Sequence, residues 1–190
     1  MSDFFYRLGR LAGPAARKGR WLWHTLVGSE GDEIRAEHGV GRDLAAEMRS
    51  TLAQDDDPAA PWWGNTYLTG LDTVALYGLL RLRNPGRYIE IGSGHSTRFA
   101  RRAIRDGGLQ TRIVSVDPNP RSEIDDLCDE AIREPLQDLD QELFATLQAG
   151  DFHFIDGSHY VFMNSDATIA FLEILPRLAP GVVTCVHDIF

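Results

Sequence analysis

The chain has 190 residues, of which 43% are hydrophobic and 25% are charged. These values are typical of a globular domain with a hydrophobic core, and they exclude a mainly disordered chain. Acidic residues outnumber basic ones by 28 to 19, and the net charge of −9 repels the phosphates of nucleic acids, so we expect no nucleic-acid partner.

The first 60 residues differ in composition from the rest, and we predict that residues 1–60 form a basic arm followed by a helical lead-in. Residues 1–30 combine basic side chains with Trp21 and Trp23. They are interpreted either as an amphipathic helix on an anionic membrane surface or as a partner-docking arm. The basic residues interrupt any signal-peptide core, so a cytoplasmic location is expected. Apolar residues at four-residue spacing predict a helix over 42–53.

From Trp62 onward, short apolar runs alternate with segments of helical periodicity. Helices are predicted where apolar residues recur at spacings of three or four, and strands where short apolar runs stop at polar residues or glycine. The predicted helices cover 72–82, 96–107, 121–130, 138–148 and the segment from Asn164 or Ser165 to Pro176, and the predicted strands cover 88–91, 112–116, 131–134, 152–155 and 182–186.

Side-chain chemistry adds caps and buried faces to three of these helices. Asp72 and Ser96 are predicted to cap the first two, and Gly107 with Gly108 to end the second. The predicted buried residues are Leu68, Leu71, Ala75, Leu79 and Leu82 for the first helix, Phe99, Ala100, Ala103 and Ile104 for the second, and Ile169, Leu172 and Leu175 for the last.

Strands that alternate with helices predict an α/β domain with a doubly wound, parallel sheet and right-handed crossovers. The domain is expected to cover residues 61–190. In open parallel sheets, ligands bind beyond the carboxyl ends of the strands. This chain places glycine, aspartate and histidine at those ends, so the functional site is expected there.

The first predicted strand leads into Glu90-Ile91-Gly92-Ser93-Gly94, whose glycines let a backbone turn sharply beside a ligand. Thr97 stands where the dinucleotide fingerprint needs its third glycine, so the pattern differs from that fingerprint. Asp117 ends the second strand, where a carboxylate can accept hydrogen bonds from both ribose hydroxyls. Its alternative role is to form the turn before Pro118. Together these features predict a cofactor that contains a nucleoside.

The fourth and fifth predicted strands end in Asp156-Gly157-Ser158-His159 and His187-Asp188. If these strands are neighbours, Asp156, His187 and Asp188 converge at one edge of the sheet. Carboxylates and an imidazole in that arrangement can hold a divalent metal or act as acid and base. The alternative is that the histidines are structural residues with satisfied hydrogen bonds.

Five ordered motifs carry a resemblance to a known family: RYIEIGSGHSTR, IVSVDPNP, GDFHFIDGSHY, SDATIAFLEILPRLAPGV and VHDIF. With them, the segment from Asn65 to Phe190 resembles class I S-adenosylmethionine-dependent methyltransferases, and among these a bacterial group often encoded near polysaccharide or glycosyltransferase genes. The resemblance implies a Rossmann-like methyltransferase sheet. That sheet has seven strands in the family, whereas five can be drawn here, so a domain truncated after its fifth strand is expected. The free edge of 182–186 then favours pairing with a second copy, as in a homodimer.

The resemblance also implies roles for individual residues, with S-adenosylmethionine as the cofactor. Its ribose would be held by Asp117, with Asn119 nearby, and its adenine approached by Gln137 and Asp138. Its methionine part would be lined by Glu90, Gly92, Ser93 and Gly94.

In metal-dependent O-methyltransferases similar to catechol methyltransferase, magnesium is held by acidic residues at the positions that Asp156 and Asp188 match. The family's usual asparagine is replaced here by Ile189, and His187 could substitute for it as a ligand. Asp156, His159 or His187 would take the proton of the acceptor.

The expected function is methyl transfer to a small acceptor, either a sugar-like hydroxyl or another hydroxyl. Two alternatives remain open, a nicotinamide-dependent oxidoreductase and a non-catalytic cofactor-binding scaffold. Cofactor affinity and turnover distinguish them.

Overall fold

A computed structural model describes residues 60–62, 65–68 and 71–188 of the chain. The predicted basic arm, its proposed membrane contact and the helix over 42–53 lie outside the described residues, as does Ile189. Within the described part of the chain, no helix is both long and apolar enough to cross a membrane.

The core of the structure is a five-stranded parallel sheet with the strand order β3-β2-β1-β4-β5. Ile89 in β1 is paired with Val114 in β2 on one side and with His153 in β4 on the other. Because β1 and β4 are neighbours in space but not in sequence, the chain reverses its winding direction between them. The predicted parallel α/β sheet is confirmed, with strands at β1 (Arg87–Ile91), β2 (Arg112–Val116), β3 (Glu130–Ile132), β4 (Phe152–Ile155) and β5 (Val183–Val186).

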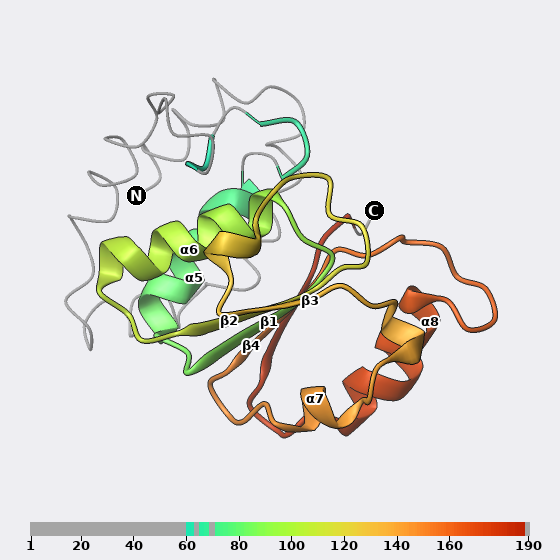
Figure 1. Cartoon of the computed structure of the whole chain (residues 1–190). Helices are drawn as coiled ribbons and strands as arrows, with labels where there is room; N and C mark the ends of the chain where they lie inside the picture. The colour runs from blue at the N-terminus through green and yellow to red at the C-terminus, as the bar shows by residue number, and fades with distance from the viewer. Residues whose placement is uncertain (1–59, 63–64, 69–70, 189–190) are drawn as a thin grey trace.

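Helices cover both faces of this sheet, which makes the fold doubly wound. Helices α5 (Leu71–Arg83) and α6 (His95–Gly107) cover one face, and α7 (Glu142–Ala145) and α8 (Asp166–Ile169) lie on the other (Figure 1). Neighbouring strand residues point to opposite faces. Tyr88 therefore packs with the α5 and α6 side chains, while the next residue, Ile89, belongs to a second core cluster on the side of α7 and α8.

Helix α6 carries the predicted buried face, with Phe99, Ala100, Ala103 and Ile104 all buried. It ends at Gly108, which has the left-handed φ of 59° that glycine adopts easily. The prediction that Ser96 caps the helix is wrong. Ser96 lies inside the first turn, and the side-chain oxygen of Thr97 instead accepts a hydrogen bond from the Gly94 N–H at 3.1 Å.

Helix α5 begins at Leu71, so Asp72 lies in its first turn and does not cap it. Its most buried side chains are Thr73, Leu76, Tyr77 and Leu80, and the predicted Ala75, Leu79 and Leu82 are only half-buried. The buried face of α5 therefore differs from the predicted one, because it includes two polar side chains, those of Thr73 and Tyr77, whose hydroxyls find hydrogen-bond partners. The Thr73 hydroxyl donates to the Leu68 carbonyl, and the Tyr77 hydroxyl donates to Asp106 at 2.9 Å.

Two predicted helices between β2 and β4 are shorter than expected. The segment 121–130 forms a single 3-10 turn at Asp125–Leu127, since Ile124 is its only buried apolar side chain and one contact cannot hold a helix. The segment 138–148 is divided between a 3-10 turn at Leu136–Asp138 and the four residues of α7. The third strand was predicted at 131–134, and β3 begins one residue earlier.

The last helical segment changes its winding twice. Ser165 caps α8 as predicted by accepting a hydrogen bond from the Thr168 N–H at 3.1 Å. A π-helical segment, Ala170–Ile174, follows and leads into a 3-10 turn at Leu175–Arg177. The wider π turn shifts the face of the helix, so Leu172 is 70% exposed where burial was predicted.

Candidate active site at the carboxyl ends of the strands

The glycine loop after β1 packs directly against the end of β4. The Gly92 N–H donates to the Val116 carbonyl at 2.9 Å, and the Asp156 N–H donates to the Ile91 carbonyl at 2.8 Å. Gly92 has φ of 80°, and a Cβ placed on it would stand 1.9 Å from the Asp156 carbonyl oxygen. Only glycine allows this contact, which joins the loop to Asp156 at the point where the sheet reverses its winding.

Glu90 stabilises the glycine loop through hydrogen bonds to β1 and to the first turn of α6, which follows the loop. Its side chain is fully buried and accepts hydrogen bonds from the hydroxyls of Tyr88 (3.0 Å), Ser96 (2.9 Å) and Thr97. Burial raises the pKa of Glu90 to about 7, although the three hydroxyls favour the charged form. The carboxylate thus ties β1 to the first turn of α6, and it is not exposed on the surface where a ligand would lie.

The buried Glu90 makes the stability of the fold pH-dependent. Its pKa rises from 4.5 in the unfolded chain to about 7 in the fold, so its stabilising contribution is fully present below 4.5 and is lost as the pH rises to 7. Relative to Glu90→Gln, the wild type should lose up to about 3 kcal/mol of unfolding free energy between these pH values. Urea denaturation at a series of pH values measures the difference.

The control for this prediction is Glu134→Gln, an exposed glutamate whose replacement should leave the pH dependence of the wild type unchanged. A difference between wild type and Glu90→Gln that stays constant with pH would contradict the prediction. His153 titrates in the opposite sense, because burial lowers its pKa to about 4 and stability is lost as the pH falls below 6.5. Because His153 is present in both proteins, its contribution cancels in the difference between the unfolding free energies of the wild type and Glu90→Gln.

Asp117 connects the end of β2 to the glycine loop. Its carboxylate accepts hydrogen bonds from the Ser93 N–H (2.9 Å), the Ser93 hydroxyl (3.0 Å) and the Asn119 N–H (2.9 Å). Each carboxylate oxygen can accept about two hydrogen bonds, so the half-buried side chain keeps room for a ligand hydroxyl. The Cβ position of Gly94 in the same loop is open, since no atom of the described residues beyond its chain neighbours lies within 4 Å of it.

The remaining residues predicted at the cofactor lie at the same edge of the sheet. Asn119 is exposed two residues after Asp117. Gln137 and Asp138 are also exposed, in the 3-10 turn that follows β3. Since β3 is the neighbour of β2, this turn and Asp117 follow adjacent strand ends.

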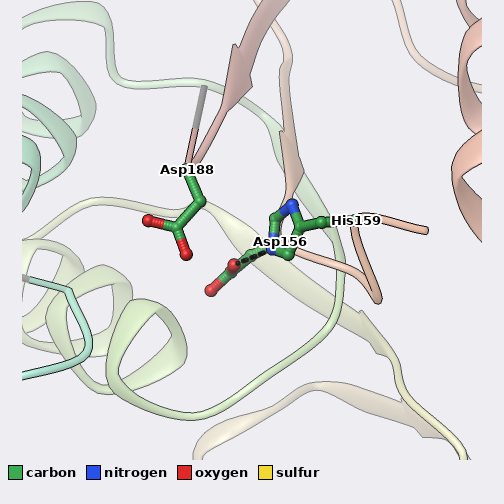
Figure 2. Close-up of side chains that lie close together, drawn as sticks. All are labelled: Asp156, His159 and Asp188. Atoms are coloured by element: carbon green, nitrogen blue, oxygen red, sulfur yellow. Dashed lines mark hydrogen bonds and ion pairs between the residues drawn. The ribbon is translucent and has the colours of Figure 1, made fainter. Parts of the chain in front are cut away.

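A cluster of polar side chains follows the ends of β4 and β5. Figure 2 shows Asp156 and His159 from the chain after β4 facing Asp188 from the end of β5. One ligand atom from each of the three residues lies within 4.8 Å of the others. The Nε2 atom of His159 is 3.2 Å from Asp156 Oδ1.

His187 joins the same cluster from its buried side. Its Nδ1 atom is 3.0 Å from Asp156 Oδ1 and 3.6 Å from Asp188 Oδ1, and its side chain is 6% exposed. Burial acts to lower the pKa of His187, but Asp156 and the other nearby carboxylates outweigh it and raise the pKa. Burial likewise acts to raise the pKa of Asp156, and the contacts with His187 and His159 lower it. The pair therefore favours a charged imidazolium beside a carboxylate.

The sequence reasoning missed Asp72 as a neighbour of this site. Its Oδ2 atom lies 3.8 Å from Nε2 of His187. Partial burial raises the pKa of Asp72, the charge of His187 acts to lower it, and the charges of Asp188 and Asp156 act to raise it further. The local sequence predicts only a helix cap at Asp72, since the approach of Asp72 to His187 depends on how α5 packs on the sheet. No local sequence signal encodes that packing.

Two residues of the cluster have strained backbones. His159 has φ of 60° and Asp188 has φ of 54°, in the left-handed region that non-glycine residues rarely adopt. Such strain is found most often at functional sites, where the surrounding structure maintains it. A cavity of about 240 Å³ opens beside these two residues and His187. The site thus combines polar residues that have strained backbones with a space for a ligand.

Comparison with known proteins identifies the segment that holds this site. A family model described as a methyltransferase domain matches residues 89–189, which is more than half of the chain. No curated protein and no solved structure matches the chain. The matched segment contains the glycine loop, Asp117, and all four residues of the polar cluster.

Proposed function

Because the chain belongs to this methyltransferase domain family, we propose that it transfers the methyl group of S-adenosylmethionine to a hydroxyl of a small acceptor. The observation that supports this most strongly is the contact between Gly92 and the Asp156 backbone. It places a loop suited to a cofactor and a cluster suited to acid–base chemistry in one crevice, at the position where doubly wound sheets bind ligands.

The cofactor would lie across the glycine loop. Asp117 would accept hydrogen bonds from the ribose hydroxyls, with Asn119 beside it, and Gln137 with Asp138 would approach the adenine. The spare acceptor capacity of Asp117 and the open position at Gly94 fit a nucleoside cofactor whose tail passes the loop. Glu90 would hold the loop in shape, since its own carboxylate is fully buried.

S-adenosylmethionine supplies an activated methyl group, so the chain has to orient the acceptor and remove its proton. His159 is the best candidate for the base that accepts this proton. It lines the cavity, and its Nε2 is held by Asp156, which would stabilise the imidazolium that forms. His187 is less suitable because its raised pKa favours the protonated form, and the lowered pKa of Asp156 makes it a weak base. The acceptor oxygen would form a bond to the methyl carbon as the bond between that carbon and the sulfonium sulfur breaks, which releases S-adenosylhomocysteine. The proton of the acceptor would pass to Nδ1 of His159, since Nε2 already contacts Asp156.

A divalent metal at Asp156, His159 and Asp188 is an alternative way to activate the acceptor hydroxyl, in which His159 would bind the ion and would not take the proton. Two carboxylates and one imidazole within 4.8 Å form a suitable set of ligands. Magnesium, which the resemblance implies, prefers oxygen ligands, and manganese also accepts the imidazole. A bound ion would lower the pKa of an acceptor hydroxyl.

The metal proposal predicts that manganese(II) binds the full chain and that Asp188→Asn weakens this binding by about tenfold or more. Calorimetric titration measures both affinities without any knowledge of the acceptor. Asp126→Asn, which changes an exposed aspartate outside the cluster, serves as the control and should bind like the wild type. Equal affinity in Asp188→Asn, or full methyl transfer in the presence of a strong chelator, would disprove a metal at this site.

The two alternative functions make different predictions. A nicotinamide-dependent oxidoreductase would bind NADH. Thr97 argues against this function, because it stands where the dinucleotide fingerprint needs its third glycine, and its hydroxyl accepts a hydrogen bond from the Gly94 N–H and donates one to Glu90. A non-catalytic scaffold would bind S-adenosylmethionine without turnover. Homodimer formation through β5 also remains a proposal. It is supported by the position of β5 at the edge of the sheet order.

A further inference from the structure

The cavity beside the polar cluster has a wall that is mostly apolar. We infer that the methyl acceptor carries its hydroxyl on an apolar body, a ring or a short alkyl chain, which this cavity receives. The inference rests on the proposed methyl transfer, and it narrows the acceptor to a class other than the sugar-like one.

Strand ends and a helix build the apolar wall together. The contributing side chains are Ile91, Ile155 and Val186 from β1, β4 and β5, Ala167 from α8, Phe171 from the π segment, and Val161 from the chain after β4. The cavity volume is about 240 Å³. Because an apolar protein cavity of about 150 Å³ is known to take up benzene, this one has room for an aromatic ring or a short alkyl chain.

Four residues with polar side chains line the cavity, and the carboxylate of one of them, Asp166, already accepts hydrogen bonds from its neighbours. His159, His187 and Asp188 belong to the cluster described above. Asp166 accepts hydrogen bonds from the N–H and hydroxyl of Ser158 and from the Ala167 N–H. A sugar brings a hydroxyl on nearly every carbon, and those facing the apolar wall would lose hydrogen bonds to water without replacement. One hydroxyl beside His159 with an apolar body behind it fits the wall better.

The apolar surface continues outside the cavity along the segment 160–163. Tyr160, Val161, Phe162 and Met163 are 71%, 83%, 63% and 92% exposed. The segment is held in place because the Phe162 carbonyl accepts hydrogen bonds from the Ser165 N–H (3.1 Å) and the Thr168 hydroxyl (2.8 Å). Val161 both lines the cavity and faces solvent, so an apolar acceptor larger than the cavity would still contact apolar side chains.

The test compares benzyl alcohol with methyl β-glucoside as probes, using the full chain with and without S-adenosylhomocysteine. NMR titration gives both dissociation constants, and we expect benzyl alcohol to bind more tightly by about tenfold or more. Tighter binding of the glucoside, or no binding of benzyl alcohol, would overturn the inference. Benzyl alcohol would also fail to bind if another part of the chain already filled the cavity, and that result would equally overturn the inference. Failure of S-adenosylhomocysteine to bind would instead count against the proposed function, since benzyl alcohol binding is also measured without it.

Matched variants locate the binding site. Phe171→Asp places a charge on the cavity wall, whereas Leu172→Asp places one on the neighbouring, 70% exposed residue outside it. A second pair, Val161→Asp and Met163→Asp, repeats the comparison on exposed residues whose replacement leaves the core intact. Benzyl alcohol affinity should fall in the Phe171 and Val161 variants and stay unchanged in the other two. An equal effect within both pairs would overturn the assignment of the ring to this cavity.

Discussion

Gly92→Ala is expected to lower the free energy of unfolding by about 2–5 kcal/mol. Two costs add up. An L-residue at the observed φ of 80° costs about 1–2 kcal/mol, and overpacking costs about 1–3 kcal/mol more. The overpacking is severe because the new Cβ would stand 1.9 Å from a backbone oxygen, that of Asp156, which no side-chain rotation can relieve. Urea denaturation of the variant and the wild type measures the loss.

Gly108→Ala is the matched control for this prediction. Gly108 has φ of 59°, and among the residues that the structure describes no atom outside its chain neighbours lies within 4 Å of its Cβ position, so the variant carries the conformational cost without the overpacking. It should lose about 1–2 kcal/mol. If both variants were destabilised equally, the contact between the glycine loop and β4 would contribute nothing. The proposal that the two halves of the site are joined there would then fail.

Asp156→Asn is expected to reduce methyl transfer by about 10²–10⁴-fold while leaving the affinity for S-adenosylhomocysteine unchanged. The carboxylate contacts both His159 and His187 through one oxygen, at 3.2 Å and 3.0 Å. An amide keeps the shape but removes the negative charge that would stabilise a protonated His159. Single-turnover measurements with radiolabelled S-adenosylmethionine report the rate.

A second measurement on Asp156→Asn does not require the acceptor. Asp156 is the main group that raises the pKa of His187, so the variant should lower that pKa, as read from the imidazole resonances during a pH titration. Asp126→Asn should leave it unchanged. An unaltered His187 titration in Asp156→Asn would show that the ion pair is absent in solution. It would also remove the reason for excluding His187 as the base.

The strand ends of this fold could be predicted from sequence because short apolar runs stop at polar residues or glycine. Ile91 is followed by Gly92, Val116 by Asp117, and Ile155 by Asp156. Parallel strands place their carboxyl ends at one edge, so local patterns were enough to gather these residues. The same reasoning predicts that His187 lies beside Asp156, and its Nδ1 atom is 3.0 Å from Asp156 Oδ1.

Features that depend on packing between distant segments could not be predicted. The approach of Asp72 to His187 requires the placement of α5 on the sheet. The exposure of Leu172 follows from a π segment, whose altered winding no spacing rule anticipates. His153 lies fully buried in β4, and neither of its ring nitrogens has a hydrogen-bond partner among the described residues. A histidine in a strand gives no sign of this in the sequence.

The most direct test of the account is calorimetric titration of the full chain with S-adenosylhomocysteine, repeated on Asp117→Ala. We expect the wild type to bind and the variant to bind about tenfold to a hundredfold more weakly, because a charged acceptor for two ribose hydroxyls is lost. NADH should not bind to either protein. Equal affinity of wild type and Asp117→Ala for S-adenosylhomocysteine, or binding of NADH in its place, would contradict the assignment of this crevice to a methyl-donor cofactor.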